Sequence, residues 1–387
     1  MRAKTIAEAV IVFGVLTFQG TAQGQENTKA ASSGMVEWVL PPLPTNKPQT
    51  DADAEEGRQH GRKLPILEVL QPVPDASLPA YQPRRDVEIA GHFKAAASDI
   101  MPGLVHLWVD AFRKYYPKFE FEVDPPYAGS LGAQELVKGA LDAVFVSREL
   151  RPDDIKDFKA KFGYDPLSVP ISGGSYRHFG FLDAVAVFVH KDNPIETLRF
   201  DQLDSIVSST RHRGGPAITT WGQLGVSGEW ADKPIHIYGV KPWNGFEEFF
   251  RQRVLSIPGK RGEWRDDINF DKLVFPVTGR VAADRYGIGY GGVAYIDAGV
   301  KVLALAEKDG GPAYPPTYEN VAKAVYPLSR VIYLNLNKAP GKPLTPALAE
   351  FLKFILSAEG QELVVKEGVF IPLRAGQAIA SRQMFQQ

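Results

Sequence analysis

Cysteine is absent from the 387 residues of this chain. Its absence excludes disulfide bonds, thiolate nucleophiles, cysteine-ligated zinc and iron–sulfur clusters, and also the modified cysteine of a lipoprotein. An excess of one charge is missing too, because 44 Lys and Arg side chains stand against 45 Asp and Glu side chains, a formal net charge of −1. A chain with balanced charge is not expected to have the broad basic surface that binds nucleic acid or anionic membranes, so neither is an expected partner. A local pocket for a small anion is compatible with it.

Signatures of catalysis and of metal binding are also missing. The seven histidines form no pair at metal-ligand spacing, and the sequence contains neither a G-x-S-x-G elbow nor a P-loop. Gly287, Gly289 and Gly292 have the G-x-G-x-x-G spacing, but a clean apolar strand does not precede them and a helix does not follow them. We therefore expect no catalytic residues, no metal and no cofactor, and hence a protein that is not an enzyme.

The first 85 residues differ in composition from the rest. Residues 1–24 carry two basic residues, an apolar stretch and then small residues, the order typical of a secretory signal peptide. The alternative is a membrane anchor, but Gln19 ends the apolar stretch before the roughly 20 residues that a span needs. Residues 25–85 are rich in proline and charge, which predicts a disordered leader. A periplasmic or secreted location follows.

From residue 86 onward, apolar stretches typical of strands alternate with amphipathic stretches typical of helices. This alternation predicts an α/β fold with mixed sheets flanked by helices. Strands are expected over 87–90, 119–123, 143–146, 181–190, 235–239 and 331–335. Helices are expected over 102–116, 134–141, 200–207 and 245–255, from residue 152 onward, and as one or two helices over 347–367.

Small polar residues follow several of the expected strands. They are Ser98-Asp99, Gly129-Ser130, Ser147-Arg148 and Asn244-Gly245. Each pair alone is better explained as a helix cap or turn, since Ser, Asp and Asn are favoured caps. Together, hydroxyls, free backbone N–H groups and one guanidinium that converge on a point would form an oxyanion receptor.

The chain from about residue 98 to 373 resembles the phosphate-binding proteins of bacterial ABC importers, the PstS-like branch of the type II periplasmic binding proteins. The matching segments occur in the family's order. They are S-D-I-M at 98–101, Trp108 through Pro117, G-S-L-G at 129–132, S-R-E-L at 147–150, V-F-V-H-K-D-N-P at 187–194, W-G-Q-L-G at 221–225, I-G-Y at 288–290, Y-P-L-S-R at 326–330 and S-A-E-G-Q at 357–361.

This resemblance implies a binding domain over 86–376 with two lobes and a ligand cleft between them. One lobe would comprise about 86–182 with 290–376, and the other 183–289. The implied ligand is phosphate or a related small oxyanion, and the implied partner is an ABC permease. We expect the protein to be a monomer. The implied ligand-binding residues are Ser98, Asp99, Gly129, Ser130, Ser147, Arg148, Lys241, Asn244 and Gly245.

The chain departs from the family pattern at the implied pocket. Ile100 stands where the family has Thr, and Val240 and Phe246 stand where the family has Arg and Thr. We expect Val240 and Phe246 to narrow and dry the cleft, with Lys241 as a point charge that lacks the planar fork of arginine. Phosphate binding is then weaker than in the family, or the ligand differs. The alternatives are a sensor or adhesion module that has lost phosphate, and a secreted hydrolase.

Overall fold

The computed structural model describes residues 73–98, 101–123, 129–176, 183–242, 245–272, 274–296 and 299–386. The predicted signal peptide and most of the predicted leader lie outside these residues, as do the site candidates Asp99 and Asn244. Gly129 and Ser130 are described as part of a helix, without their side chains. No helix within the described ranges is long and apolar enough to cross a membrane.

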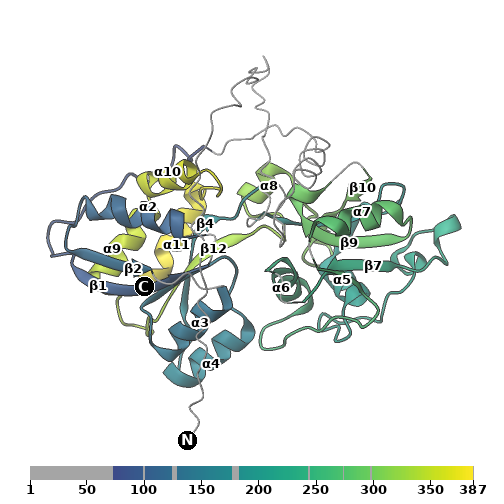
Figure 1. Ribbon diagram of the computed structural model, residues 1–387, viewed down its shortest axis with the longest axis horizontal. Coiled ribbons are helices and arrows are strands. Elements are labelled where there is room, and N and C mark those ends of the chain that lie inside the picture. The colour runs from purple at the N-terminus through teal and green to yellow at the C-terminus, as the bar shows by residue number, and fades with distance from the viewer. Residues whose placement is uncertain are drawn as a thin grey trace, which may run out of the picture.

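The described chain forms two lobes, each built on a five-stranded sheet (Figure 1). The first sheet has the order β2-β1-β3-β12-β4, in which β1 is parallel to β2 and β3, and β12 is antiparallel to β3 and β4. Its strands are β1 (Gly91–Ala97), β2 (Phe119–Val123), β3 (Ala143–Val146), β4 (Leu167–Gly173) and β12 (Val331–Leu336).

The second sheet has the order β10-β5-β9-β7-β8 and is also mixed, with β7 parallel to β8 and β9. Its strands are β5 (Val185–His190), β7 (His236–Val240), β8 (Asn269–Asp271), β9 (Gly287–Gly292) and β10 (Val300–Val302). A separate parallel pair joins β6 (Thr197–Arg199) and β11 (Ala304–Ala306). Mixed sheets flanked by helices are the fold class that the sequence predicts.

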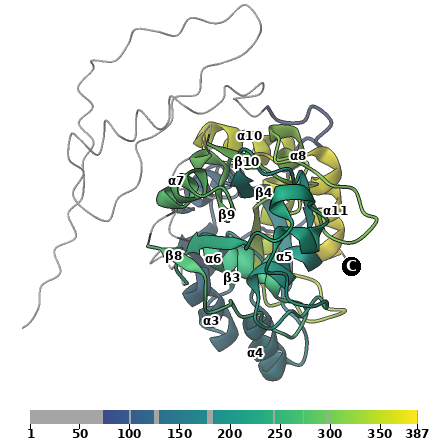
Figure 2. The ribbon, with the colours of Figure 1, turned by 90° about the vertical axis from the view of Figure 1, so that its right-hand side faces the viewer.

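Helices flank both sheets (Figures 1 and 2). Those of the first lobe are α2 (Pro102–Arg113), α3 (Gly129–Lys138), α4 (Pro152–Phe162), α9 (Pro346–Ile355), α10 (Ala358–Glu367) and α11 (Ala375–Gln386). Those of the second lobe are α5 (Phe200–Val207), α6 (Gly245–Phe250), which continues as the π-helical turn η3 (Arg251–Leu255), α7 (Phe275–Ala283) and α8 (Tyr318–Ala322). Short 3-10 turns are η1 (Trp221–Leu224), η2 (Gly228–Trp230) and η4 (Val293–Tyr295).

Local sequence explains where the helices of the first lobe begin and which face they bury. Pro102 occupies the first turn of α2, and the side chains of Leu104, Trp108 and Phe112 on one face of that helix are fully buried. The hydroxyl of Ser357 accepts the N–H of Gly360 and caps α10. These apolar faces pack with the first sheet into one hydrophobic cluster, and a second cluster fills the other lobe.

Two predicted strands differ from the observed ones by more than one residue. Residues 87–90 form no strand, because ladder pairing with β2 starts only at Gly91, opposite Phe119. The strand expected over 181–190 starts at Val185, the first residue that pairs with β9. Strands 119–123 and 143–146 have the predicted bounds.

The predicted boundary between the lobes at residue 290 is wrong. Tyr290 lies inside β9, which pairs with β5 and β7 in the second sheet, and β10 extends that sheet further. Glycine-rich β9 is a central strand because its glycines admit close packing: a Cβ at Gly289 would lie 2.9 Å from Val281 Cγ2. The second lobe therefore continues to about Leu328, and the first lobe resumes at β12.

The chain crosses between the lobes twice, and the crossing segments are hydrogen-bonded to each other. The N–H of Gly174, just after β4, donates to the carbonyl of Arg330 at 2.8 Å, and the N–H of Val185 donates to the carbonyl of Leu328 at 3.1 Å. β4 and β12, which lead into these crossings, are neighbours in the first sheet. A paired double crossing is the usual structure of a hinge between two lobes.

Residues 73–85 contradict the prediction of a disordered leader that extends to Arg85. Leu78 and Tyr81 are buried in the cluster of the first lobe. The Tyr81 hydroxyl donates to Glu350 Oε1 at 2.9 Å, and its N–H donates to Glu359 Oε2 at 2.6 Å. An aromatic residue and a leucine supply enough apolar area to order a short proline-containing segment, so the folded part begins before residue 86.

We therefore expect a protein that starts at Asp86 to be less stable than one that starts at Val73. Loss of the buried side chains of Leu78 and Tyr81 removes about 1.5–3 kcal/mol each. The free energy of unfolding, measured by urea denaturation, should fall by about 4 kcal/mol. Val73→Ala is the control, because Val73 is 70% exposed and should change nothing. Equal stability of the two truncated proteins would contradict the docking of this segment.

Candidate anion-binding site

The site forms at the edge of the first sheet where β1 and β3 end. These strands are parallel neighbours with Ala97 opposite Phe145, so the residues that follow them emerge side by side. Ser98 follows β1 and is buried, with its N–H donating to the Phe145 carbonyl at 3.0 Å. Ser147, half-buried, and Arg148 follow β3. The structure therefore brings Ser98, Ser147 and Arg148 together, as their places after the strands predict.

Arg148 is a buried cation. The residue is only 6% exposed, and Nη1 of its guanidinium donates to the backbone carbonyl of Glu149 at 2.7 Å. Burial lowers the pKa of the guanidinium, and the charge of Arg151 lowers it further, while Asp154 acts in the opposite direction. No carboxylate of the described chain lies within ion-pair distance of this guanidinium.

Arg330 is a second buried cation; it ends the Y-P-L-S-R motif and is not among the ligand-binding residues expected from the sequence. It immediately precedes β12, which runs antiparallel to β3 with Tyr333 opposite Val146, so Arg330 reaches the same edge as Arg148. The residue is 4% exposed, and burial lowers the pKa of its guanidinium to about 10; the charges of Asp183 and Glu149 act in the opposite direction, and that of Arg148 lowers the pKa further. The group remains charged at neutral pH.

The guanidinium of Arg330 faces the second lobe. Nη1 donates to the carbonyl of Gly245, the first residue of α6, at 3.4 Å, and Cζ lies 4.3 Å from the ring centroid of Phe249. Phe246 lies beside the same group, with its ring centroid 5.8 Å away. Nε of Arg330 has no hydrogen-bond partner within the described part of the chain. Arg330 thus joins the hinge to the start of α6.

The predicted site residues of the second lobe are Lys241, Asn244 and Gly245, and they differ in what the structure shows of them. Gly245 is exposed at the first turn of α6, where backbone N–H groups are free of intrahelical partners. Lys241 is exposed, and its N–H donates to the Asp271 carbonyl at 2.8 Å. Within the described part of the chain, Lys241 makes no hydrogen bond or ion pair with Arg148 or Arg330. Asn244 lies outside them.

Val240 does not line the cleft, contrary to the sequence-based expectation. It is fully buried in the hydrophobic cluster of the second lobe, and its N–H and carbonyl are both within hydrogen-bond distance of the Tyr290 hydroxyl, at 3.3 and 3.1 Å. Its position at the end of β7 puts an apolar residue in the core. Phe246, by contrast, does lie at the site, against Arg330.

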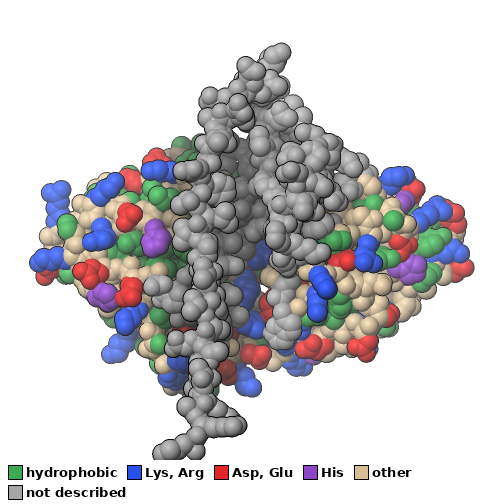
Figure 3. All heavy atoms as spheres, in the orientation of Figure 1, with side chains coloured by type: hydrophobic (Ala, Val, Ile, Leu, Met, Phe, Trp, Pro, Cys, Tyr) green, Lys and Arg blue, Asp and Glu red, His purple; other side chains and the backbone are tan. Residues whose placement is uncertain are grey.

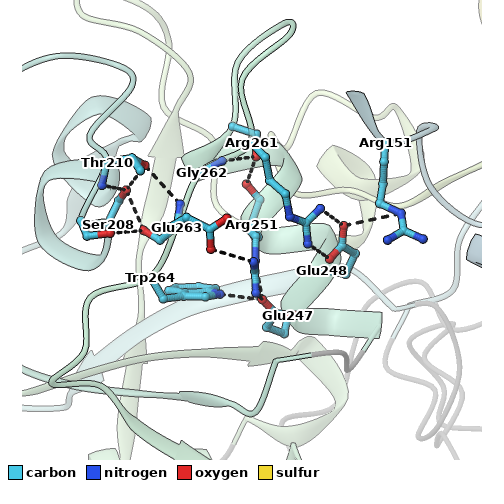
Figure 4. A network of polar contacts seen from close by, with 12 residues as sticks. Arg151, Ser208, Thr210, Glu247, Glu248, Arg251, Arg261, Gly262, Glu263 and Trp264 are labelled. Atoms are coloured by element: carbon cyan, nitrogen blue, oxygen red, sulfur yellow. Dashed lines mark hydrogen bonds and ion pairs between the residues drawn. The ribbon is translucent and has the colours of Figure 1, made fainter. Parts of the chain in front are cut away.

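A charged network anchors the helix that faces the first lobe (Figure 4). The carboxylate of Glu247 is fully buried and accepts hydrogen bonds from Arg251 Nε at 2.7 Å and Trp264 Nε1 at 2.6 Å. The next residue, Glu248, accepts both terminal nitrogens of Arg261, at 2.8 and 2.7 Å. α6 and η3 are thereby fixed to the second lobe.

Contacts between the lobes surround the loop that carries Arg148. Gln252 Nε2 of η3 donates to the carbonyls of Glu149 and Leu150 at 3.1 and 2.6 Å, and Arg253 Nη1 lies 3.3 Å from Glu149 Oε1. Arg151 Nε lies 4.0 Å from Glu248 Oε1, a pair drawn in Figure 4. Lys and Arg side chains, drawn blue, are visible near the middle of the view in Figure 3, where the two lobes meet.

The arrangement can hold an anion and repels a cation. Two buried guanidiniums without a carboxylate partner in the described ranges leave positive charge that a small oxyanion can neutralise, and guanidinium forks match its oxygens. The hydroxyls of Ser98 and Ser147 lie at the same edge of the sheet. The described residues contain no cluster of His, Asp and Glu that could hold a metal.

Comparisons with known proteins agree with this geometry. A family model described as a PBP superfamily domain matches residues 85–359. The phosphate-binding protein PstS of Pseudomonas aeruginosa is 37% identical over 303 residues, 78% of this chain and 88% of that protein. Protein SphX of Synechococcus elongatus is 25% identical over 258 residues, 66% of this chain and 69% of that protein. The crystal structure of PstS from Borrelia burgdorferi shares the fold, with a TM-score of 0.51 and 17% identity over 73% of this chain and 98% of that one.

Loss of the Glu247 carboxylate should destabilise the protein. Glu247→Ala leaves Arg251 and Trp264 with buried donors that lack this acceptor, and breaking a buried ion pair costs about 3–5 kcal/mol. The matched control is Glu319→Ala, which removes an exposed ion pair with Lys323 on α8 and should cost less than about 1 kcal/mol. Urea denaturation followed by circular dichroism measures both. Equal losses would show that the network in Figure 4 does not anchor the helix.

Proposed function

The chain belongs to the PBP superfamily and, within it, to the family of the PstS phosphate-binding proteins, and from this premise we propose that it captures phosphate between its lobes for an ABC importer. The observation that carries the proposal is the pair of buried guanidiniums, Arg148 and Arg330, at the boundary of the lobes. A tetrahedral oxyanion offers acceptors to both at once. Capture then needs no chemical step, so the protein is not an enzyme.

Each lobe supplies part of the proposed pocket. The first lobe would contribute Arg148 with the hydroxyls of Ser98 and Ser147, and the backbone at the start of α3, where Gly129 and Ser130 lie. The hinge would contribute Arg330, and the second lobe the free N–H groups at Gly245. Asp99, Asn244 and Lys241 remain proposed ligands on family resemblance alone. Closure of the lobes on the anion would shift an open–closed equilibrium.

Arg330 supports phosphate binding despite the apolar Val240. Val240 is an apolar core residue and supplies no guanidinium from β7, but Arg330 presents one at the start of α6, from the hinge. Because Arg330 belongs to the Y-P-L-S-R segment that matches the family, it would keep one family guanidinium at the pocket without replacing the one that Val240 lacks. A second candidate function, a sensor that has lost phosphate, rests on the bulk of Phe246 beside Arg330.

We further propose export, with residues 1–24 as a cleaved signal peptide and residues 25–72 as an extended leader between the cleavage site and the docked segment. The protein would act as a monomer in the periplasm or outside the cell and deliver its ligand to a permease. Neither nucleic acid nor a cofactor enters this function.

Isothermal titration tests the proposal. Wild-type protein should bind phosphate, while Arg148→Met and Arg330→Met should each weaken binding at least about tenfold, because a hydrogen bond to a charged group contributes about 1.5–3 kcal/mol. Methionine keeps apolar volume without the charge. Since each arginine is buried without a carboxylate partner in the described chain, neither variant should melt at a lower temperature than wild type by more than a few degrees.

The control is Arg280→Met, which removes a side chain that is 53% exposed on α7 and should leave affinity unchanged. Sulfate, titrated in parallel, reports selectivity. Absence of phosphate binding by the wild-type protein would favour the sensor. A variant that has a lower melting temperature but binds phosphate normally would assign its arginine a structural role. Normal phosphate binding by both arginine variants would show that the site does not lie at this edge of the sheet.

A further inference from the structure

Gln252 and Arg148 share one acceptor across the boundary between the lobes. The carbonyl oxygen of Glu149 accepts Arg148 Nη1 at 2.7 Å from within the first lobe and Gln252 Nε2 at 3.1 Å from the second. The same amide also donates to the Leu150 carbonyl at 2.6 Å. The backbone that orients the buried cation of the site is therefore held by a side chain of the opposite lobe.

We propose that Gln252 is a positioning residue for anion binding: it fixes the loop after β3, and with it the Arg148 guanidinium, when the lobes come together. This inference rests on the proposed function, because the anion is the ligand of Arg148. Gln252 does not itself contact the anion. It makes the strength of binding depend on a contact that forms only in the closed arrangement.

The helix that presents Gln252 is built to hold it firmly. Gln252 lies in the π-helical turn η3, where Ser256 N–H donates to the Arg251 carbonyl at 2.9 Å, and π-helical turns occur often at functional sites. The guanidinium of Arg213 donates to the carbonyls of Val254 and Arg253 at 2.5 and 2.6 Å. It satisfies carbonyls that such a turn leaves without helical partners.

Arg253, the neighbouring residue in η3, adds a second contact with the same loop. Nη1 lies 3.3 Å from Glu149 Oε1, while Nη2 is already held by Glu307 Oε1 and by the Pro327 carbonyl, each at 3.0 Å. Contacts within the second lobe thus hold the Arg253 side chain in place where it contacts Glu149. Backbone and side chain of Glu149 are both held by η3.

The contact between η3 and the loop after β3 can open without exposing an apolar core to water. It consists of polar groups and borders a pocket of about 240 Å³ that Glu149, Leu150, Gln252 and Arg253 help to line. Polar, hydrated boundaries between lobes permit relative motion, whereas large apolar ones do not. Opening therefore replaces these hydrogen bonds by hydrogen bonds to water, and closing restores them.

Gln252→Leu, which keeps the size of the side chain but removes its donors, tests the inference. Small-angle scattering of the ligand-free protein should show a larger radius of gyration than wild type. Stopped-flow binding should show phosphate released about 5- to 20-fold faster with the association rate nearly unchanged, because the closed state is populated less. Gln252→Asn keeps the amide and should recover part of the affinity, which a purely structural role would not predict.

The matched control is Gln223→Leu. It removes a side-chain amide elsewhere in the second lobe, whose oxygen accepts the N–H of Thr220. It should leave the radius and the release rate unchanged. Equal radius and equal release rate for Gln252→Leu and wild type would overturn the inference. If wild-type protein binds no phosphate at all, the proposed function fails, and the scattering of the ligand-free variants alone decides whether Gln252 holds the lobes together.

Discussion

The two guanidiniums of Arg148 and Arg330 are withdrawn from water at the boundary of the lobes, and the rest of the structure accommodates the free-energy cost of that burial. A buried charge is costly unless an opposite charge or several hydrogen bonds compensate it. Here the described residues provide a backbone carbonyl to each group and an aromatic face to Arg330, but no ion-paired carboxylate. Among the described residues the compensation is thus incomplete, which is why we propose that an anion binds between the two guanidiniums.

The topology explains why these cations meet. β1, β3 and β12 are consecutive in the first sheet, and the pairing directions bring the ends of β1 and β3 beside the beginning of β12. Arg330 lies on the crossing segment, so its side chain belongs to the hinge, and its contact with the Gly245 carbonyl links that hinge to α6. The buried charge, the crossing segment and α6 are thereby in direct contact, so a change in the angle between the lobes would alter the surroundings of Arg330.

Much of this was predictable from the sequence. The family was recognised from ordered short motifs and confirmed by the relatives, and the strand–helix alternation predicted the mixed sheets. That Ser98, Ser147 and Arg148 lie at one edge of the sheet was predictable because small polar residues follow neighbouring parallel strands; their role as ligands comes from the family resemblance and stays a proposal. The bounds of 143–146 followed from a short apolar stretch flanked by polar residues, and those of 119–123 from an alternation of apolar residues with glutamate.

The errors have local physical causes. A glycine-rich strand such as β9 has little apolar signal of its own, so the extent of the second lobe was underestimated. Arg330 was not assigned to the site because its role depends on the antiparallel return of β12, a pairing between residues far apart in the chain. Val240 was expected in the cleft because the family has an arginine at that position, but a valine at the end of β7 packs into the hydrophobic cluster instead. Tyr81 was placed in a disordered leader because its partners Glu350 and Glu359 lie on α9 and α10, far from it in the sequence.

The most direct test of the central claim is a crystal structure of the protein grown with arsenate, a phosphate analogue whose arsenic atom is located by anomalous scattering. The account predicts a single strong peak between the lobes, with the arsenate oxygens within hydrogen-bond distance of the guanidiniums of both Arg148 and Arg330. A peak bound elsewhere, with both guanidiniums still without an anionic partner, would contradict it.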